Sequence, residues 1–169
     1  MKLWKIKRSI IHGTGVFAND NIKKGLKIIE YIGEKVSKKE GDRRSELRIE
    51  KYLNSEKTGS VYIFELNDRY DIDGNFSYNK ARFINHSCNP NCEVDIIRGK
   101  IWIKSIKNIL KGEELSYDYG YEFDKDDYID HLCKCGSKNC IGYIISSDDK
   151  EKFKKFIKKV SKKNGTRKS

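Results

Sequence analysis

The sequence predicts a mainly β domain of the α+β class, followed by a cysteine-rich loop and a basic helix. Short runs of β-branched and aromatic residues, separated by Gly, Asn and Asp, fill the first two-thirds of the chain. Three cysteines fall within the eight residues from Cys133 to Cys140. The C-terminal region is rich in lysine and carries apolar residues at helical spacing. These patterns favour several short sheets and only a few helices.

Eight short runs are expected to form strands, because each combines β-branched or aromatic residues with turn residues at its ends. Arg98-Gly99 separates two of these runs and predicts a hairpin turn. The runs are Leu3–Ile6, Gly15–Ala18, Lys27–Tyr31, Val61–Leu66, Tyr70–Asp73, Glu93–Ile97, Lys100–Ser105 and Glu114–Tyr117.

The segment from Ser37 to Tyr52 differs from these runs. It is highly charged, lacks proline, and places Leu47, Ile49 and the following Leu53 among polar residues. We expect a surface helix there, with Ser37 as its N-cap.

A second helix is expected from about Asp149 to Lys162, ending before Asn164-Gly165. Its apolar residues recur at i, i+3, i+4 and i+7 on a lysine-rich background: Phe153, Phe156, Ile157 and Val160. This stripe is expected to pack on the domain. Docking to a partner or to a membrane surface is the alternative use of such a stripe.

Composition narrows the class of protein. A chain of 169 residues favours one compact domain with a short appendage. It contains no run of 18 apolar residues, which argues against a membrane span. Met1 to Arg8 lacks the apolar core of a signal peptide, so we expect an intracellular, soluble protein, in the cytoplasm or on nuclear chromatin. Five cysteines in such a chain indicate thiols or metal ligands rather than disulfides.

Most of the formal net charge of +11 lies in the C-terminal tail. Residues 150–169 contain ten Lys or Arg and one acidic residue, whereas the preceding 149 residues together carry only about +2. A basic tail attracts nucleic acid or acidic surfaces through salt-sensitive electrostatics. The sequence therefore allows a weak nucleic-acid contact, with a simple solvated tail as the alternative.

The cysteine-rich segment has the spacing C-x-C-x4-C, formed by Cys133, Cys135 and Cys140. A structural zinc ion takes four tetrahedral ligands, usually thiolates. Three are present here, so a fourth must come from elsewhere, and the candidates are Cys88, Cys92 and His131. Free thiols are the alternative, but a cluster of thiols without a metal is prone to oxidation.

The segment Arg82–Cys92 concentrates polar side chains that bind ligands or carry out chemistry, including Asn85, His86 and Ser87. A Cys–His hydrolase pair with Cys88 or Cys92 as nucleophile is one interpretation. A buried structural histidine at position 86 is another. The sequence has ten tyrosines, of which Tyr31, Tyr117 and Tyr119 lie in the most informative contexts. Each of them alone could equally be a core aromatic residue.

Taken together and in this order, the motifs of the chain resemble those of SET-domain lysine methyltransferases with a C-terminal post-SET zinc loop. The resemblance covers roughly residues 4–145. It rests on His12–Ala18, Glu30–Glu34, Arg82–Cys88 with its Asn-His-Ser-Cys, Gly112–Tyr119 with its Glu-Glu-Leu and Tyr-Asp-Tyr, and the C-x-C-x4-C loop that leads to Gly142-Tyr143-Ile144.

The resemblance implies a SET-type pseudoknotted β-clip fold of short sheets, in which Asn85–Cys88 and Tyr117–Tyr119 cross. The expected division is 1–125 for the SET domain, 126–146 for the zinc loop and 147–169 for the basic helix and tail. It also implies that Cys88 completes the Zn²⁺ site with Cys133, Cys135 and Cys140. It implies S-adenosyl-L-methionine as methyl donor, bound by His12, Gly13, Thr14, Gly15, Tyr62, Arg82, Asn85 and His86.

By the same resemblance, Tyr119 is the main catalytic tyrosine, Tyr31 lines the lysine channel, and Tyr117 occupies a position where the family has Tyr or Phe. A tyrosine at position 117 leaves less room for methyl groups, so we expect mono- or dimethylation of a protein lysine. The acidic segment Tyr121–Asp130 could face a basic substrate such as a histone or ribosomal-protein tail, or it could be a solvated loop. A non-catalytic binding module with a nucleic-acid-binding tail is the alternative function, and a zinc-loop nucleic-acid binder is a third.

Overall fold

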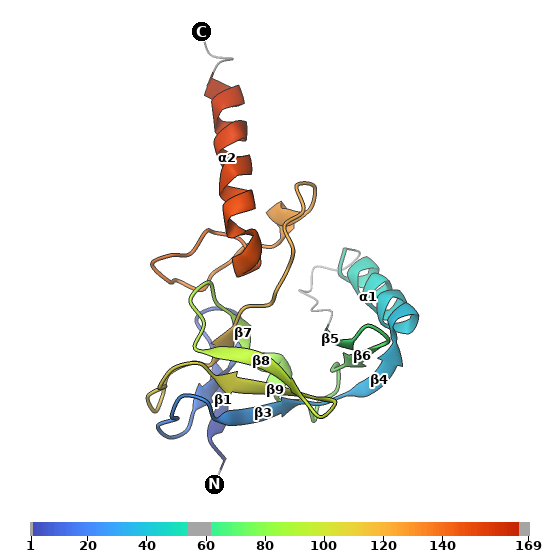
Figure 1. The fold of residues 1–169 in the computed structure, drawn as a ribbon, viewed down its shortest axis with the longest axis vertical. Coiled ribbons are helices and arrows are strands. Elements are labelled where there is room, and N and C mark those ends of the chain that lie inside the picture. Colours follow the sequence, from blue (N-terminus) through green and yellow to red (C-terminus); the bar gives the residue numbers. More distant parts are fainter. Residues whose placement is uncertain (1, 54–61, 166–169) are drawn as a thin grey trace.

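The computed structural model describes residues 2–53 and 62–165, and the described part contains four small β-sheets (Figure 1). β1 (Trp4–Arg8) pairs with β2 (Thr14–Ala18) in an antiparallel ribbon. A second sheet has the order β3 (Lys27–Tyr31), β9 (Lys100–Ser105), β8 (Cys92–Ile97). A third has the order β4 (Glu34–Ser37), β6 (Tyr70–Asp73), β5 (Ile63–Asn67).

The fourth sheet brings together segments that lie about 30 residues apart in the sequence. β7 (Asn85–His86) pairs in parallel with β10 (Ser116–Tyr117), and Asn85 lies opposite Ser116. The backbone N–H of Ser87 also donates to the carbonyl of Tyr117, at 3.1 Å. The predicted meeting of these two segments is thereby confirmed, and the mainly β fold class with it.

The described residues contain two α-helices, one in the first third of the chain and one near its C-terminus. α1 (Lys38–Leu53) follows β4 directly, and Ser37 Oγ accepts a hydrogen bond from the Glu40 N–H at 3.3 Å, which confirms the predicted N-cap. α2 (Lys150–Gly165) follows the short 3₁₀ helix η3 (Ser147–Asp149). Two further 3₁₀ turns, η1 (Ala81–Phe83) and η2 (Tyr128–Asp130), precede β7 and the cysteine loop respectively.

The main hydrophobic core lies between the sheets and is built from alternate residues of the strands. Val16, Ile29, Ile103 and Leu115 are almost completely buried in it. Burial of each such side chain contributes on the order of 1.5–3 kcal/mol. The buried rings of Tyr31 and Tyr117 belong to the same cluster, so the core also fixes part of the candidate site.

A second hydrophobic cluster supports α2. Phe153 is 4% exposed and packs with Phe123 and Ile145. Phe156 and Ile157 pack against the edge of this cluster, while Val160 is 38% exposed. The stripe thus packs on the domain over the first two turns, and Figure 1 shows the rest of α2 projecting from the body.

The structure differs from the sequence expectations in two unpredicted strands, one shorter strand and the end of one helix. The run predicted as Glu114–Tyr117 is a strand only over Ser116–Tyr117 (β10). β4 and β7 were not predicted, because β4 carries two charged residues in four and β7 has only two residues. The prediction that α2 ends before Asn164-Gly165 was wrong, since an Asn-Gly pair disfavours a helix by only about 1 kcal/mol and does not block it. Val61, at the start of one predicted strand, lies outside the described residues.

None of the described helices has the length and apolar character that crossing a membrane would require.

Candidate functional site

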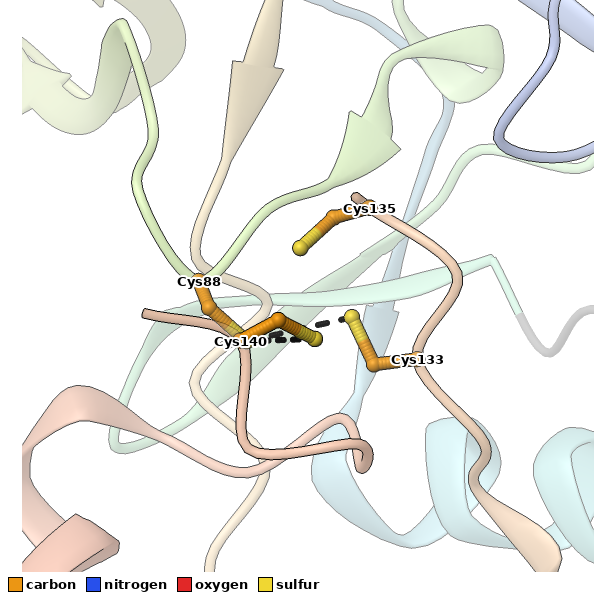
Figure 2. A group of neighbouring side chains, drawn as sticks. All are labelled: Cys88, Cys133, Cys135 and Cys140. Carbon is orange, nitrogen blue, oxygen red and sulfur yellow. Dashed lines mark hydrogen bonds between the residues drawn. The ribbon is translucent and has the colours of Figure 1, made fainter. Parts of the chain in front are cut away.

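Four cysteines meet at the junction between β7 and the C-terminal loop. The Sγ atoms of Cys88, Cys133, Cys135 and Cys140 all lie within 4.8 Å of one another (Figure 2). Cys88 Sγ is 3.8 Å from Cys133 Sγ and 3.9 Å from Cys140 Sγ. Four sulfurs at about 2.3 Å from a tetrahedral zinc ion would be separated by about 3.8 Å. The cluster therefore has the donor set and the size that zinc requires.

The other two candidates for the fourth ligand lie elsewhere. Cys92 is 1% exposed, and its thiol donates to Asn91 Oδ1 at 3.4 Å. Burial raises the pKa of Cys92 to about 12, which keeps this thiol protonated. His131 faces Asp127, with 3.8 Å between Nε2 and Oδ2, and its ring lies against that of Tyr121. The structure thus brings Cys88, and neither alternative, to the C-x-C-x4-C loop.

The thiols of the cluster differ in their acidity. Burial opposes ionisation of Cys135, but its hydrogen bond with Ser137, at 3.1 Å between Sγ and Oγ, lowers the pKa of Cys135 to about 6. Burial raises the pKa of Cys88 and of Cys133. Cys135 therefore ionises more readily than Cys88 and Cys133, and metal binding would release protons from these two thiols.

His86 joins the cysteine cluster to the tyrosine segment. Its Nδ1 accepts a hydrogen bond from the Tyr119 N–H at 3.2 Å, which places the ring proton on Nε2. Nε2 lies 3.6 Å from Cys88 Sγ and therefore donates to that sulfur. Burial lowers the pKa of His86, with Asp118 opposing the shift, so the ring is neutral at pH 7.

This contact does not support a Cys–His hydrolase. A catalytic cysteine needs an accessible thiol with a lowered pKa. Cys88 is 5% exposed, burial raises the pKa of its thiol, and its sulfur is surrounded by three other sulfurs.

Asn85 anchors the loop between β1 and β2. Its Nδ2 lies 3.4 Å from the carbonyl oxygen of His12 and 3.2 Å from that of Thr14. The same group donates to Glu114 Oε1 at 2.7 Å, and Glu114 also accepts from Ser9 Oγ at 2.8 and 2.9 Å. A single carboxylate therefore connects the β1–β2 loop, β7 and the segment before β10.

Gly13 in the β1–β2 loop and Gly15 in β2 have different roles. Gly13 has a φ of +46°, a conformation that favours glycine. At Gly15 a Cβ atom would lie 2.4 Å from Glu114 Oε1, so only glycine leaves room for the carboxylate. His12 and Gly13 are exposed. Their carbonyls accept from Asn85 Nδ2 and the Ser9 N–H, and the His12 N–H donates to Ser9 Oγ. Among the described contacts, the N–H of Gly13 is therefore the backbone group left for a ligand.

Five aromatic rings form a continuous row from β3 to the segment after β10. The successive centroids are 5.1 Å apart for Tyr31 and Phe64, 6.1 Å for Phe64 and Tyr117, 5.0 Å for Tyr117 and Tyr119, and 5.9 Å for Tyr119 and Tyr121. Burial raises the pKa of the four tyrosines, which keeps their hydroxyls neutral. The row can therefore form an uncharged aromatic wall.

The tyrosine hydroxyls of this row differ in their hydrogen bonding. Tyr31 Oη donates to the carbonyl of Tyr62 at 2.9 Å, and Tyr119 Oη donates to the carbonyl of Ile84 at 3.0 Å. The Tyr117 hydroxyl has no hydrogen-bond partner in the part of the chain that the structure describes. The Tyr121 hydroxyl likewise has none among the described residues. Of these two tyrosines, Tyr117 is the buried one, and its hydroxyl is free to bond to a substrate inside the row.

Arg82 lies beside this wall. Its guanidinium carbon is 5.1 Å from the ring centroid of Tyr62 and 4.8 Å from that of Phe83, and one Nη donates to Asn75 Oδ1 at 3.1 Å. Its Nε is buried and has no acceptor among the described residues. Tyr62 has a φ of +57°, which is rare outside glycine. An unpaired donor beside a strained residue is consistent with a site that takes a polar ligand.

Sequence reasoning missed three residues of this site. Glu114 belongs to the Glu-Glu-Leu motif, but its role depends on contacts with Ser9 and Asn85 that the sequence does not reveal. Phe64 and Tyr121 complete the aromatic row. Their aromatic character was visible, but it gave no indication of which way the rings face.

Comparison with known proteins identifies the family. Residues 13–120 match the SET domain. This match covers more than half of the chain. It contains Asn85, His86 and Cys88, and also Tyr31, Tyr117 and Tyr119 of the aromatic row.

The chain belongs to the SET-domain family.

Several curated relatives align with this SET-domain protein over most of its length. A protein of Aspergillus oryzae named histone-lysine N-methyltransferase, H3 lysine-4 specific, is 41% identical over 146 residues, which are 83% of this chain. The protein of the same name from Saccharomyces cerevisiae is 40% identical over 141 residues, or 81% of the chain. Histone-lysine N-methyltransferase trithorax of Drosophila virilis is 42% identical over 141 residues, again 81%.

The relatives are much longer than this SET-domain protein. The aligned region spans only 11%, 13% and 3% of those three proteins respectively.

Proposed function

We propose that this SET-domain protein is an S-adenosylmethionine-dependent protein-lysine N-methyltransferase that transfers one or two methyl groups to a lysine of a basic protein tail. The observation that carries the proposal is the row of neutral tyrosines beside Asn85 and His86, within a chain of the SET-domain family. The names of the relatives support the same activity.

Lysine methylation requires a neutral amine. Free lysine titrates near 10.4, so neutralising it at pH 7 costs about 4–5 kcal/mol. A dry aromatic channel lowers this cost because desolvation disfavours the ammonium form. The aromatic row provides such surroundings, since Tyr31 and Tyr117 are 4% and 8% exposed and stay uncharged.

The second requirement is alignment of the amine with the methyl donor, which can be worth about 7–11 kcal/mol. When bound, S-adenosylmethionine supplies an electrophilic methyl group on a sulfonium. We assign Tyr119 and Tyr31 to positioning the lysine, since backbone carbonyls fix both hydroxyls. The free hydroxyl of Tyr117 would hold the amine and limit the number of methyl groups.

The cofactor would lie between the β1–β2 loop and β7. Asn85 holds the loop in place through its Nδ2, so we assign it mainly to shaping the pocket. The unpaired Nε of Arg82 is suited to an anionic group of the cofactor, such as its carboxylate. The residues that we propose to bind S-adenosylmethionine are His12, Gly13, Thr14, Gly15, Tyr62, Arg82, Asn85 and His86.

We propose that Cys88, Cys133, Cys135 and Cys140 bind one structural zinc ion. The distances within the cluster support a closed tetrahedral site without an open position for a substrate. Such an ion would hold the C-terminal loop against β7. His86 would connect it to Tyr119 through its two ring nitrogens.

A basic protein tail is the proposed substrate, and the tail of histone H3 is the first to test. Acidic side chains gather after Tyr121 and all are exposed: Glu122, Asp124, Asp126, Asp127 and Asp130. They follow the outer end of the aromatic row, where a lysine-rich tail would approach. Two of the relatives are named for H3 lysine 4. A histone substrate would place the reaction on chromatin.

The experiment is methyl transfer from labelled S-adenosylmethionine to a histone H3 N-terminal peptide and, in parallel, to a basic protein fraction. We expect label on lysine that is lost with Tyr119→Phe. Absence of label in every sample, although the cofactor binds, would contradict the activity. Label in the protein fraction alone would contradict only the choice of substrate.

A further inference from the structure

The lysines of α2 lie on the side of the helix opposite to its apolar stripe. At about 100° per residue, the four apolar side chains fill an arc of roughly 100°, and the lysines fill an arc of roughly 200°. Most of these lysine side chains are exposed. The lysines of α2 whose side chains the structure describes are Lys150, Lys152, Lys154, Lys155, Lys158 and Lys159.

The apolar side of α2 is already occupied by the domain. The Phe153 ring lies 5.4 Å from the rings of Phe123 and Tyr128 and 5.5 Å from that of Tyr143. A helix that lies on a membrane must insert its apolar face into the lipid. α2 would have to give up these contacts to do so, which argues against a membrane surface as its partner.

Three lysines of α2 form no hydrogen bond or ion pair within the described residues, although the charges of Lys155 and Lys158 contribute to lowering the pKa of Glu151. Lys154 pairs with Glu151 at 2.6 Å, and Lys150 donates to the carbonyl of Cys88 at 2.9 Å. In contrast, Lys155, Lys158 and Lys159 are exposed and form no ion pair there.

A groove beside the helix adds to this positive surface. Its volume is about 580 Å³, and it is lined by the rings of Phe123 and Phe156 and by lysines of α2 and the preceding loop. The lysines are Lys125, Lys152, Lys155 and Lys159, against one carboxylate, that of Asp124. The groove is therefore suited to an anionic ligand.

The width of the lysine arc indicates the kind of partner. A flat acidic protein surface meets one side of a helix, whereas a helix in the major groove of DNA has phosphates on both sides. Beyond its second turn α2 projects from the body, which leaves both flanks accessible (Figure 1). The deep, narrow major groove of duplex RNA does not admit a helix in this way.

We infer that α2 binds duplex DNA through its phosphates, with Lys155, Lys158 and Lys159 as its main contacts. Sequence-specific readout is not expected, because lysine-phosphate contacts carry no base information. This surface is separate from the aromatic row, and the inference does not depend on methyl transfer.

The test is fluorescence anisotropy of the full chain with a labelled 20-base-pair duplex, at a series of salt concentrations. Each lysine-phosphate contact contributes about 0.9 to the slope of log affinity against log salt. In the triple variant Lys155→Gln, Lys158→Gln, Lys159→Gln, the affinity should therefore depend less steeply on salt, and the magnitude of the slope should fall by about 2.7. The kcat for methylation of a free peptide should be unchanged, because these lysines are not assigned to the active site. KM for the peptide is not used as the control, since Lys155 and Lys159 line the same groove as Asp124.

The matched control removes the same charge elsewhere. Lys23, Lys24 and Lys111 are exposed and lie in loops near β2, and their substitution by Gln should leave the slope unchanged. An equal decrease in both triple variants would overturn the inference, as would absence of binding at low salt. Equal binding of single-stranded DNA would contradict the groove geometry. Tighter binding of polyglutamate, lost in the α2 variant, would assign the surface to an acidic protein instead.

Discussion

Glu114 is the residue whose removal should separate cofactor binding from methyl transfer. Glu114→Ala leaves Asn85 Nδ2 and Ser9 Oγ without their shared acceptor, so the β1–β2 loop loses its anchor. A hydrogen bond to a charged group is worth about 1.5–3 kcal/mol. We expect KM for S-adenosylmethionine to rise by at least about tenfold, with a smaller change in kcat, as measured by steady-state kinetics.

The neighbouring Glu113 provides the control. Its carboxylate is exposed and accepts one hydrogen bond from the Leu110 N–H at 3.0 Å. Glu113→Ala should leave KM for the cofactor nearly unchanged. Equal increases in KM for the two variants would show that Glu114 has no special role in shaping the pocket.

Tyr117 should determine how many methyl groups are added. Tyr117→Phe removes the free hydroxyl and enlarges the space around the amine, while the ring keeps its contacts with Phe64 and Tyr119. We expect the product to shift towards higher methylation states, measured by mass spectrometry of a methylated peptide. The same product ladder in both proteins would refute this role.

The two cysteines near β7 should respond differently to the same substitution. Cys88→Ser removes one of the four grouped thiols and should abolish both zinc content and activity. Cys92→Ser places a hydroxyl in a buried position outside the cluster. It should retain zinc, at a modest cost in stability. Metal analysis of the purified variants measures this, and loss of zinc with Cys92→Ser would contradict the ligand set.

Some residues of the candidate site could be predicted from the sequence, and others could not. The C-x-C-x4-C spacing identified Cys133, Cys135 and Cys140 directly, but ligand counting alone left the fourth position open. Family resemblance selected Cys88, and the structure places its sulfur with theirs. Glu114 could not be assigned a role, because its partner Ser9 lies 105 residues away in the sequence.

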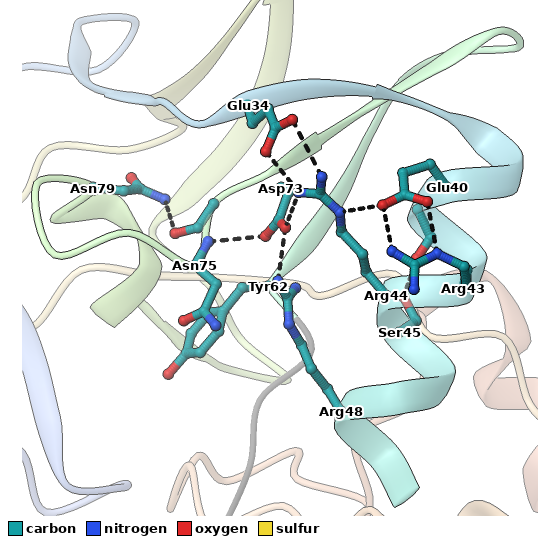
Figure 3. A network of polar contacts seen from close by, with 12 residues as sticks. Glu34, Glu40, Arg43, Arg44, Ser45, Arg48, Tyr62, Asp73, Asn75 and Asn79 are labelled. Atoms are coloured by element: carbon teal, nitrogen blue, oxygen red, sulfur yellow. Dashed lines mark hydrogen bonds and ion pairs between the residues drawn. The ribbon is translucent and has the colours of Figure 1, made fainter. Parts of the chain in front are cut away.

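At the scale of elements, α1 is held to the β4–β6–β5 sheet by ion pairs that converge on a buried aspartate (Figure 3). Asp73 is 1% exposed, and its Oδ2 accepts from Arg44 at 2.8 Å and from Arg48 at 2.7 Å. The next residue, Gly74, lies so close to the Tyr31 ring that a Cβ would be 2.4 Å from it. The network therefore supports the inner end of the aromatic row.

Asp73→Asn should lower the free energy of unfolding by about 2–3 kcal/mol. Arg44 would keep Glu34 and Glu40 as partners, which limits the loss. Because Gly74 contacts Tyr31, kcat should fall as well. Urea denaturation gives the stability change, and Arg43→Gln, at an arginine with a 59% exposed side chain, should cost less than about 1 kcal/mol.

The contribution of the ion pairs of Asp73 to the free energy of unfolding depends on pH in a defined direction. Burial opposes ionisation of Asp73, but the hydrogen bonds from Arg48 and Arg44 outweigh it and lower its pKa below 3.8. The contribution to stability is therefore present above about pH 4 and is lost as the pH falls through the lowered pKa. Unfolding curves below pH 4 should converge for the wild type and Asp73→Asn. A constant difference at all pH values would contradict this origin.

Strands and turns could be predicted from the sequence where a local residue pattern is typical of them. Three predicted runs coincide with strands, because each combines β-branched or aromatic residues with turn residues at its ends. They are Lys27–Tyr31 (β3), Tyr70–Asp73 (β6) and Lys100–Ser105 (β9). The turn at Arg98-Gly99 has positive φ at both residues, as a tight hairpin requires. β7 was not predictable, because two residues become a strand only through pairing with β10.

At the scale of the whole molecule, the site exists only where distant segments meet. The β1–β2 loop, β7, β10 and the cysteine loop contribute to it from positions 9 to 140 of the chain. Family resemblance predicted that these segments meet, but sequence patterns alone carried no information on their distances. Two contacts connect the cysteine cluster to the aromatic row, from Cys88 to His86 and from His86 to Tyr119. The proposed zinc ion would therefore stabilise the active site from outside the reaction.

The most direct test is a chelator titration in which zinc content and methyl transfer are measured in the same samples. The account predicts about one zinc per chain, loss of transfer in proportion to the zinc removed, and recovery of both when zinc is added back under reducing conditions. Methyl transfer that persists after all zinc has been removed would contradict the account.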